Sequence, residues 1–200
     1  MFENRIYLSP PHMNAEDRKL LEDAFDSNWI APLGPYVDRF EDEISRYLNI
    51  DHAAALSSGT SALHLALKVL GIKQGDKVLC PSLTFSASAN VILYEKAEPI
   101  FIDSSAYNWV IDLEACEKAM IKYKPKALIS VDLYGESCDY DKLGYLCNKY
   151  NVFLIEDAAE ALGSEYKKQK CGSFGSLSTL SFNGNKLSLI HISEPTRLNP

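Results

Sequence analysis

The sequence lacks clusters of basic residues and long apolar runs. It has 20 Lys and Arg against 27 Asp and Glu, a formal net charge of −7. Nucleic acids and anionic membranes are poor partners for such a chain, because both require basic patches. No apolar stretch approaches the roughly 18 residues of a membrane helix, and MFENRIYLSPPHM has no signal-peptide pattern. We therefore expect a cytoplasmic protein with no membrane or nucleic-acid partner.

Paired cysteine motifs are also absent. The five cysteines are odd in number, widely scattered and form no CxxC motif: Cys80, Cys116, Cys138, Cys147 and Cys171. Reduced thiols are the expected state of such residues in the cytoplasm. None of the four histidines pairs with them at the spacing of zinc ligands, so we predict no metal site.

Short apolar runs alternate with helical patterns along the 200 residues, which make one domain or a large part of a bigger one. Strands are predicted at 77–82, 98–103, 126–135 and 151–159. Helices are predicted at 85–95, 112–123 and 139–150, and two earlier ones at about 14–27 and 36–48. Continuous apolar character is typical of strands covered on both faces. The pattern therefore predicts an α/β fold, a three-layer sandwich with a mainly parallel central sheet.

Ligands of such sheets bind at the carboxyl ends of the strands, and three segments there could bind one. In the first, SSGT at 57–60 precedes a helix whose apolar stripe includes Leu63 and Leu67. Hydroxyls, glycine and the helix dipole make a helix start suitable for a phosphate, and an ordinary helix cap is the alternative. His64, within this helix, is interpreted as a packed or surface histidine rather than a ligand.

The second and third segments supply a carboxylate and an aromatic ring. Asp157 ends an apolar strand, where a carboxylate is costly unless a cationic group meets it. It could cap a loop, bind a metal or face a protonated ring nitrogen. A metal is disfavoured because no histidine or carboxylate partner lies nearby in the sequence at a suitable spacing. Phe85 follows another strand, where its ring could stack on a flat ligand or pack in the core.

Lys186 closes the stretch SFNGNK. A lysine buried there would have a lowered pKa and a nucleophilic amine, although most lysines lie on the surface. A phosphate cradle, an aromatic plate, a strand-end aspartate and a lysine are together the parts needed to hold pyridoxal phosphate (PLP).

These motifs resemble the DegT/DnrJ/EryC1/StrS family of sugar aminotransferases, which are PLP-dependent enzymes of fold type I. The resemblance runs from about Tyr7 to Lys186 and includes SSGTSALHLAL, PSLTF, EDAAEALGS and SFNGNK. It implies the large domain of that fold. LSPPHM and SNWIAPLGP look most like the branch that makes UDP-4-amino-4,6-dideoxy-N-acetylglucosamine.

The resemblance also implies residue roles in binding the phosphate and in catalysis. Gly59 and Thr60 would bind the cofactor phosphate, and Ser181 would add its hydroxyl. Lys186 would carry the cofactor as a Schiff base and shuttle the proton. Because this residue is a lysine rather than the histidine of the family's dehydratases, transamination is the expected chemistry.

The remaining implied roles concern the pyridine ring and the substrates. Phe85 would stack on the ring, Asp157 would pair with its nitrogen, and Glu160 would lie by the 3′-oxygen or the substrate amine. The amino group would pass from an amino acid, glutamate by family habit, to C4 of a nucleotide-linked 4-keto-6-deoxy sugar, UDP-linked and N-acetylated. A sibling aminotransferase acting on a dTDP-linked sugar is the alternative.

We expect the chain to divide into three parts. Residues 1–35 would form an N-terminal helix and substrate loop, and 36–186 an incomplete PLP-binding large domain. The tail, 187–200, does not match the family and looks like a translated adapter or frame-shifted sequence. We therefore expect an N-terminal fragment with little activity, taken from an enzyme that is a homodimer at full length.

Two other classes of function stay open. A non-catalytic regulator could use the same fold, although ligand binding alone does not need a Schiff-base lysine. A Rossmann-type phosphate-binding domain is a weaker alternative, because no G-x-G-x-x-G follows the first strand.

Overall fold

The computed structural model describes residues 13–29 and 31–183 of the chain. These residues divide into two units. The first comprises the described residues up to Ala55, together with Phe182 and Asn183, and the second comprises Leu56–Ser181.

The first unit contains two helices, α1 (Ala15–Asp26) and α2 (Pro35–Leu48). Asn14 caps α1, because its side chain accepts hydrogen bonds from the backbone N–H groups of Glu16 and Asp17. Pro35 occupies the first turn of α2, where its missing N–H costs nothing. The helices predicted at about 14–27 and 36–48 are thus confirmed.

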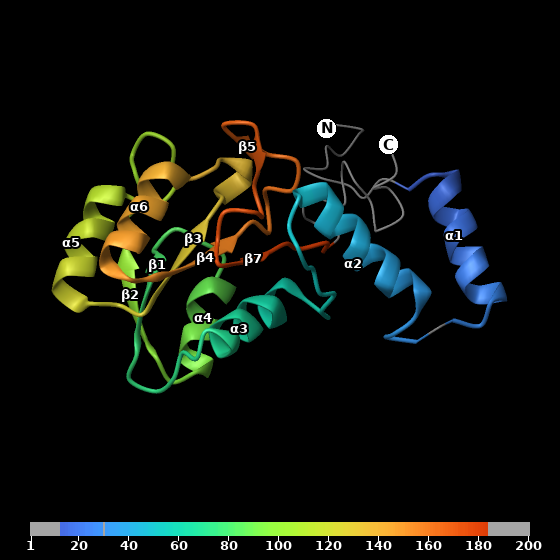
Figure 1. The fold of residues 1–200 in the computed structure, drawn as a ribbon, viewed down its shortest axis with the longest axis horizontal. Helices are drawn as coiled ribbons and strands as arrows, with labels where there is room; N and C mark the ends of the chain where they lie inside the picture. Colours follow the sequence, from blue (N-terminus) through green and yellow to red (C-terminus); the bar gives the residue numbers. More distant parts are fainter. Residues whose placement is uncertain (1–12, 30, 184–200) are drawn as a thin grey trace, which may run out of the picture. The chain divides into compact units, whose positions relative to one another are not determined.

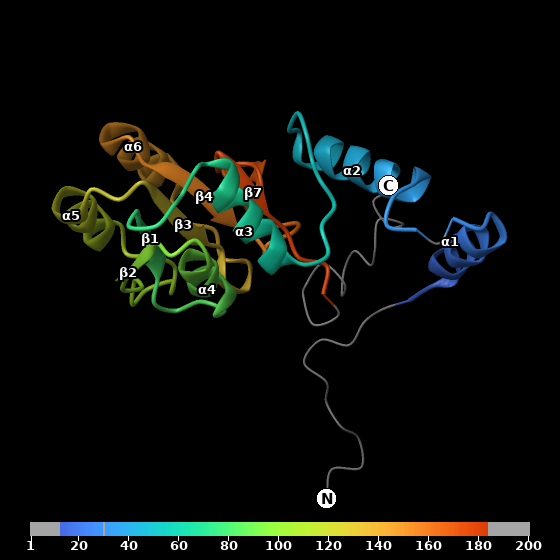
Figure 2. The same ribbon diagram turned by 90° about the horizontal axis from the view of Figure 1, so that it is seen from below.

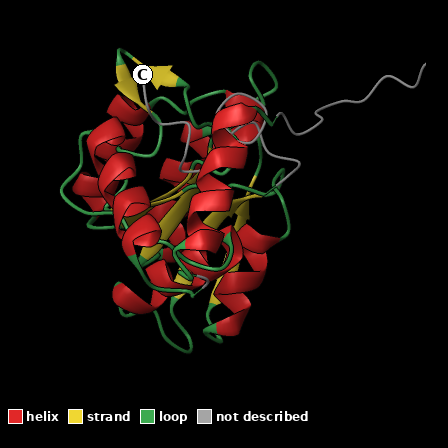
Figure 3. Cartoon of the chain, turned by 90° about the vertical axis from the view of Figure 1, so that its right-hand side faces the viewer, coloured by secondary structure: helices red, strands yellow, loops and turns green. Residues whose placement is uncertain are grey.

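The second unit is built around a five-stranded parallel sheet with the strand order β2-β1-β3-β4-β7. Its strands, in chain order, are β1 (Lys77–Pro81), β2 (Glu98–Ile102), β3 (Ala127–Val131), β4 (Phe153–Asp157) and β7 (Leu177–Thr179). The helices are α3 (Gly59–Val69), α4 (Ala87–Tyr94), α5 (Leu113–Tyr123) and α6 (Tyr140–Tyr150). The strands stand between helices in the ribbon and the cartoon (Figures 1 and 3).

Alternate residues of the central strands enter two separate cores. Val78 and Ile129 pack with α3 and α4 on one face of the sheet, whereas Leu79 and Leu128 pack with α5 and α6 on the other. The two helix pairs lie on opposite sides of the sheet (Figures 1 and 2). A strand covered on both faces must be apolar at successive positions, which explains the continuous runs in the sequence. The predicted three-layer α/β sandwich is confirmed.

The structure differs from the predicted elements in two places. The strand predicted at 126–135 ends at Val131, because Asp132 turns inward and a short 3₁₀ helix, η1 (Leu133–Gly135), follows. β7 and a two-stranded hairpin, β5 (Glu165–Tyr166) with β6 (Gln169–Lys170), were not predicted from the sequence. These segments are short and polar, so they have no apolar run to mark them.

All five cysteines lie among the described residues. All five thiols are free and buried. Among the described residues, no helix combines the length and the apolar character required to cross a membrane.

Candidate functional site

Asp157 is the last residue of β4 and is only 5% exposed. Its Oδ2 accepts a hydrogen bond from Ser88 Oγ at 2.9 Å, and its Oδ1 accepts one from the backbone N–H of Ala159 at 3.3 Å. In the sheet, Asp157 is in register with Val131 of β3 and Thr179 of β7. A nearly buried carboxylate thus lies at the carboxyl edge of three neighbouring strands.

The start of α3 lies against the segment that follows β7. A Cβ on Gly59 would come within 3.3 Å of the Cβ of Ser181 and 3.6 Å of the carbonyl oxygen of Leu180. Ser58 caps the helix by accepting from the N–H of Ser61 at 3.1 Å. The N–H groups of Gly59 and Thr60 are in the first turn and have no intrahelical acceptor. Because Ser181 is two residues beyond Thr179, this helix start and Asp157 lie at the same sheet edge.

Two further predicted residues lie at strand ends. Phe85 follows β1 and is 65% exposed, so the alternative that its ring packs in the core is wrong. Glu160 follows β4, and its Oε2 accepts a hydrogen bond from the backbone N–H of Tyr134 at 3.0 Å. Tyr134 has a left-handed backbone (φ 55°) within η1. This contact joins the loops that follow β3 and β4.

Lys186 lies outside the described residues, so its predicted role stays a prediction. The structure thus gathers Gly59, Ser181 and Asp157 at one sheet edge, with Thr60 next to Gly59. His64 Nε2 lies within hydrogen-bond distance of Glu95 Oε1 at the α4 C-cap, in agreement with its interpretation as a packed or surface histidine.

A buried acidic cluster lies beneath this edge, and the sequence analysis did not predict it. One ligand atom each of Asp132, Glu156 and Cys171 lies within 4.8 Å of the other two. The Glu156 carboxylate already has four donors: the N–H groups of Gly172, Phe174 and Gly175, and the hydroxyl of Ser178. Backbone N–H groups and a hydroxyl, rather than a cation, therefore stabilise the Glu156 carboxylate. Few of its lone pairs remain to bind a metal ion.

The Asp132 carboxyl group of this cluster is unusual. Its Oδ1 accepts hydrogen bonds from Tyr140 Oη at 2.7 Å and from the N–H of Cys138 at 3.1 Å. Its Oδ2 is buried and has no hydrogen-bond partner among the described residues. Burial, followed by the negative charge of Glu156, raises the pKa of Asp132 to about 7. A protonated Oδ2 is itself a donor and needs an acceptor, and the neighbouring Glu156 carboxylate is the group of this cluster that can accept from it. An acidic residue directly after an apolar strand was the only sign in the sequence.

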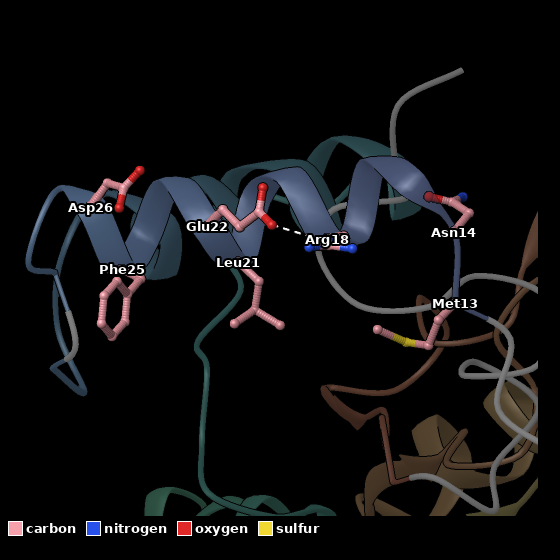
Figure 4. Close-up of a pocket in the computed structure, with 7 residues that line it drawn as sticks. All are labelled: Met13, Asn14, Arg18, Leu21, Glu22, Phe25 and Asp26. Atoms are coloured by element: carbon pink, nitrogen blue, oxygen red, sulfur yellow. Dashed lines mark hydrogen bonds and ion pairs between the residues drawn. The ribbon is translucent and has the colours of Figure 1, made fainter.

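The first unit contains a groove of about 700 Å³ along α1. Apolar side chains of Met13, Leu21 and Phe25 line it, together with the Arg18–Glu22 ion pair (Figure 4). None of its lining residues is a predicted site residue. The groups that can carry chemistry gather at the sheet edge of the second unit instead.

Known proteins resemble this chain over most of its length. The family model described as the DegT/DnrJ/EryC1/StrS aminotransferase family matches residues 11–190. The chain belongs to this family. EpsN from Bacillus subtilis (strain 168) is 50% identical over 188 residues, which are 92% of this chain and 48% of EpsN. The GDP-perosamine synthase of Vibrio cholerae is 42% identical over 176 residues, 88% of this chain and 48% of that enzyme.

The fold of this family member also matches solved structures. Spr1654 from Streptococcus pneumoniae, solved in PMP and PLP forms, superposes with a TM-score of 0.86 at 32% identity. The match covers 92% of this chain and 50% of that protein. The chain therefore spans about half the length of the curated relatives it matches.

Proposed function

We propose that the whole protein carrying these residues is a PLP-dependent aminotransferase that aminates a nucleotide-linked keto sugar. Membership of the family supports the reaction class. The observation that carries the proposal is that the start of α3, which is suited to an anion, lies at the same sheet edge as a nearly buried carboxylate.

The described residues fit this cofactor. Gly59 lets the backbone of α3 approach Ser181 closely. A side chain at position 59 would narrow the gap between the start of α3 and Ser181. Two N–H groups of the first turn, the Thr60 and Ser181 hydroxyls and the helix dipole suit a phosphate dianion. The Asp157 carboxylate, whose oxygens accept hydrogen bonds from Ser88 and Ala159, is the acidic acceptor at this sheet edge that suits a protonated ring nitrogen.

Each residue has a distinct task in this proposal. The start of α3 holds the phosphate, and Asp157 keeps the ring nitrogen protonated. PLP, when bound, supplies an electron sink for the carbon that bears the amino group. Lys186 moves the proton at that carbon, and Phe85 covers one face of the ring. Glu160 lies by the ring 3′-oxygen or the substrate amine, held by its hydrogen bond from Tyr134.

The finer proposal concerns the substrates. We propose glutamate as the amino donor and C4 of a UDP-linked, N-acetylated 4-keto-6-deoxy sugar as the acceptor. The resemblance of LSPPHM and SNWIAPLGP to one branch of the family supports UDP. The 42% identity to a GDP-perosamine synthase favours a GDP-linked sugar as the second candidate. We also propose that the whole protein is a homodimer, which sedimentation velocity would test.

The test is a transamination assay on the whole protein with PLP, glutamate and UDP-, GDP- and dTDP-linked 4-keto sugars. We expect amination of one of them, and a loss of at least about 1,000-fold in rate for Lys186→Ala. Lys118→Ala removes an exposed lysine of α5 and should leave the rate unchanged. A Lys186→Ala variant as active as the wild type would refute the proposed chemistry. Activity with GDP- or dTDP-linked sugars alone would refute the UDP-linked sugar as the acceptor.

A further inference from the structure

Ser88 is a polar residue at a position where its helix is otherwise apolar. It is fully buried in the first turn of α4, where its neighbours on the buried face include Ala87, Val91 and Ile92. A hydroxyl in such surroundings needs a hydrogen-bond partner. The partner is Asp157, 69 residues away in the sequence, whose Oδ2 accepts from Ser88 Oγ at 2.9 Å.

This hydrogen bond fixes one side of the Asp157 carboxylate. With the N–H of Ala159 on Oδ1 and the Ser88 hydroxyl on Oδ2, each oxygen has its own donor. Two donors on different oxygens determine the plane of the carboxylate, and Asp157 is too buried for water to replace them readily. The group is therefore oriented by the protein itself.

The contacts of Ser88 extend to the loop that carries Phe85. Thr84 Oγ1 lies 2.9 Å from Ser88 Oγ, and the backbone N–H of Ser88 donates to the carbonyl oxygen of Phe85 at 3.2 Å. Ser88 thus connects the loop after β1 with the end of β4. A shift of Ser88 would disturb both the carboxylate and the aromatic residue.

We propose that Ser88 is a positioning residue, whose buried hydroxyl orients the Asp157 carboxylate toward the protonated ring nitrogen of PLP. This inference rests on the proposed function. Ser88 itself touches neither cofactor nor substrate in this assignment and acts through Asp157. Its effect should therefore depend on the presence of a ring nitrogen in the ligand.

The test compares two ligands on the same protein. Equilibrium binding of PLP and of 1-deaza-PLP, which has carbon in place of the ring nitrogen, is measured on the whole protein. Ser88→Ala should weaken PLP binding about 10-fold, the size of one lost hydrogen bond to a charged group. Binding of the analogue should change by less than about 2-fold. A general loss of stability would weaken both ligands equally, so the ratio isolates the role of Asp157.

Matched variants complete the experiment. Ser88→Thr retains the hydroxyl and should restore the preference for PLP. Ser86→Ala removes an exposed hydroxyl at the start of the same helix and should change neither affinity. Should Ser88→Ala not fold, Ser88→Cys keeps the volume but donates weakly, and the same selective loss is expected.

The outcomes separate this inference from the proposed function. Equal weakening of both ligands, or no weakening, in a protein that binds PLP would overturn the role of Ser88 and leave the proposed function standing. A wild-type protein that does not bind PLP would overturn both.

Discussion

Raising the pH from 5 to 8 should weaken the fold through one buried carboxyl group, that of Asp132. Asp132 is fully buried at the end of β3, and its backbone N–H donates to the carbonyl oxygen of Asp157 at 3.1 Å. Its side chain lies among Tyr140, Cys138, Cys171 and Glu156, none of which is cationic. Burial and the Glu156 charge raise the pKa of Asp132 from 3.8 to about 7.

The sign follows from which state holds the proton. The folded chain keeps Asp132 protonated up to about pH 7, whereas the unfolded chain releases this proton near pH 3.8. Between these values the folded state binds more protons, so the free energy of unfolding falls as the pH rises. Its contribution is fully present below pH 3.8 and fully lost above about pH 7. The total loss between pH 3.8 and about 7 is up to about 4 kcal/mol, at about 1.4 kcal/mol for each pH unit, and about 3 kcal/mol of it falls between pH 5 and 7.

The assay is urea unfolding followed by circular dichroism at pH 5, 6, 7 and 8, on the wild type and on Asp132→Asn. The amide oxygen can still accept from Tyr140 and Cys138, while the NH₂ group offers Glu156 a permanent donor. We expect the stability of the variant relative to the wild type to rise between pH 5 and about pH 7 and then to level off. Groups that titrate in both proteins cancel in the difference. If the unfolding free energies of the two proteins changed in parallel with pH across this range, the buried proton on Asp132 would be refuted.

The remaining predictions concern glycines. Gly175→Ala should destabilise the fold by about 3 kcal/mol in thermal or urea unfolding, because its Cβ would clash with the carbonyl oxygen of Leu177. Gly144→Ala is the matched control, because a Cβ at this position of α6 meets nothing within 4 Å. It should stabilise the fold by about 0.5–1 kcal/mol, and a loss of stability would contradict the open space at this position. Gly59→Ala should leave unfolding nearly unchanged but weaken PLP binding about 10-fold, because its Cβ narrows the space beside Ser181. Unchanged affinity would argue against a phosphate there.

The layered fold was predictable because each layer leaves its own periodicity in the sequence. β1, β3 and β4 are buried at almost every position, so they read as continuous apolar runs. The cap of α1 by Asn14 is similarly local. The predicted end of β3 was wrong by several residues. Asp132 accepts a hydrogen bond from Cys138, and the left-handed Tyr134 donates to Glu160 of another loop, so the chain leaves the strand there.

The candidate site was predictable only in part, for the same reason. Gly59 and Asp157 occupy positions next to the carboxyl edge of a parallel sheet, where ligands bind. Their place in the sequence was therefore enough to identify them as candidate site residues. Ser88 did not stand out, because its partner is 69 residues away and SASAN resembles an ordinary helix start. The pairing of Asp132 with Glu156 needs adjacent strands in one register, which no local pattern specifies.

The proposed chemistry depends most on the amine of Lys186, and one labelling experiment tests the role of this amine directly. The whole protein is mixed with PLP, reduced with borohydride and digested, and the peptides are analysed by mass spectrometry. We expect the phosphopyridoxyl group on Lys186, and a loss of this label in Asp157→Ala at limiting PLP. Label spread over surface lysines, or absent from position 186, would contradict the proposed site.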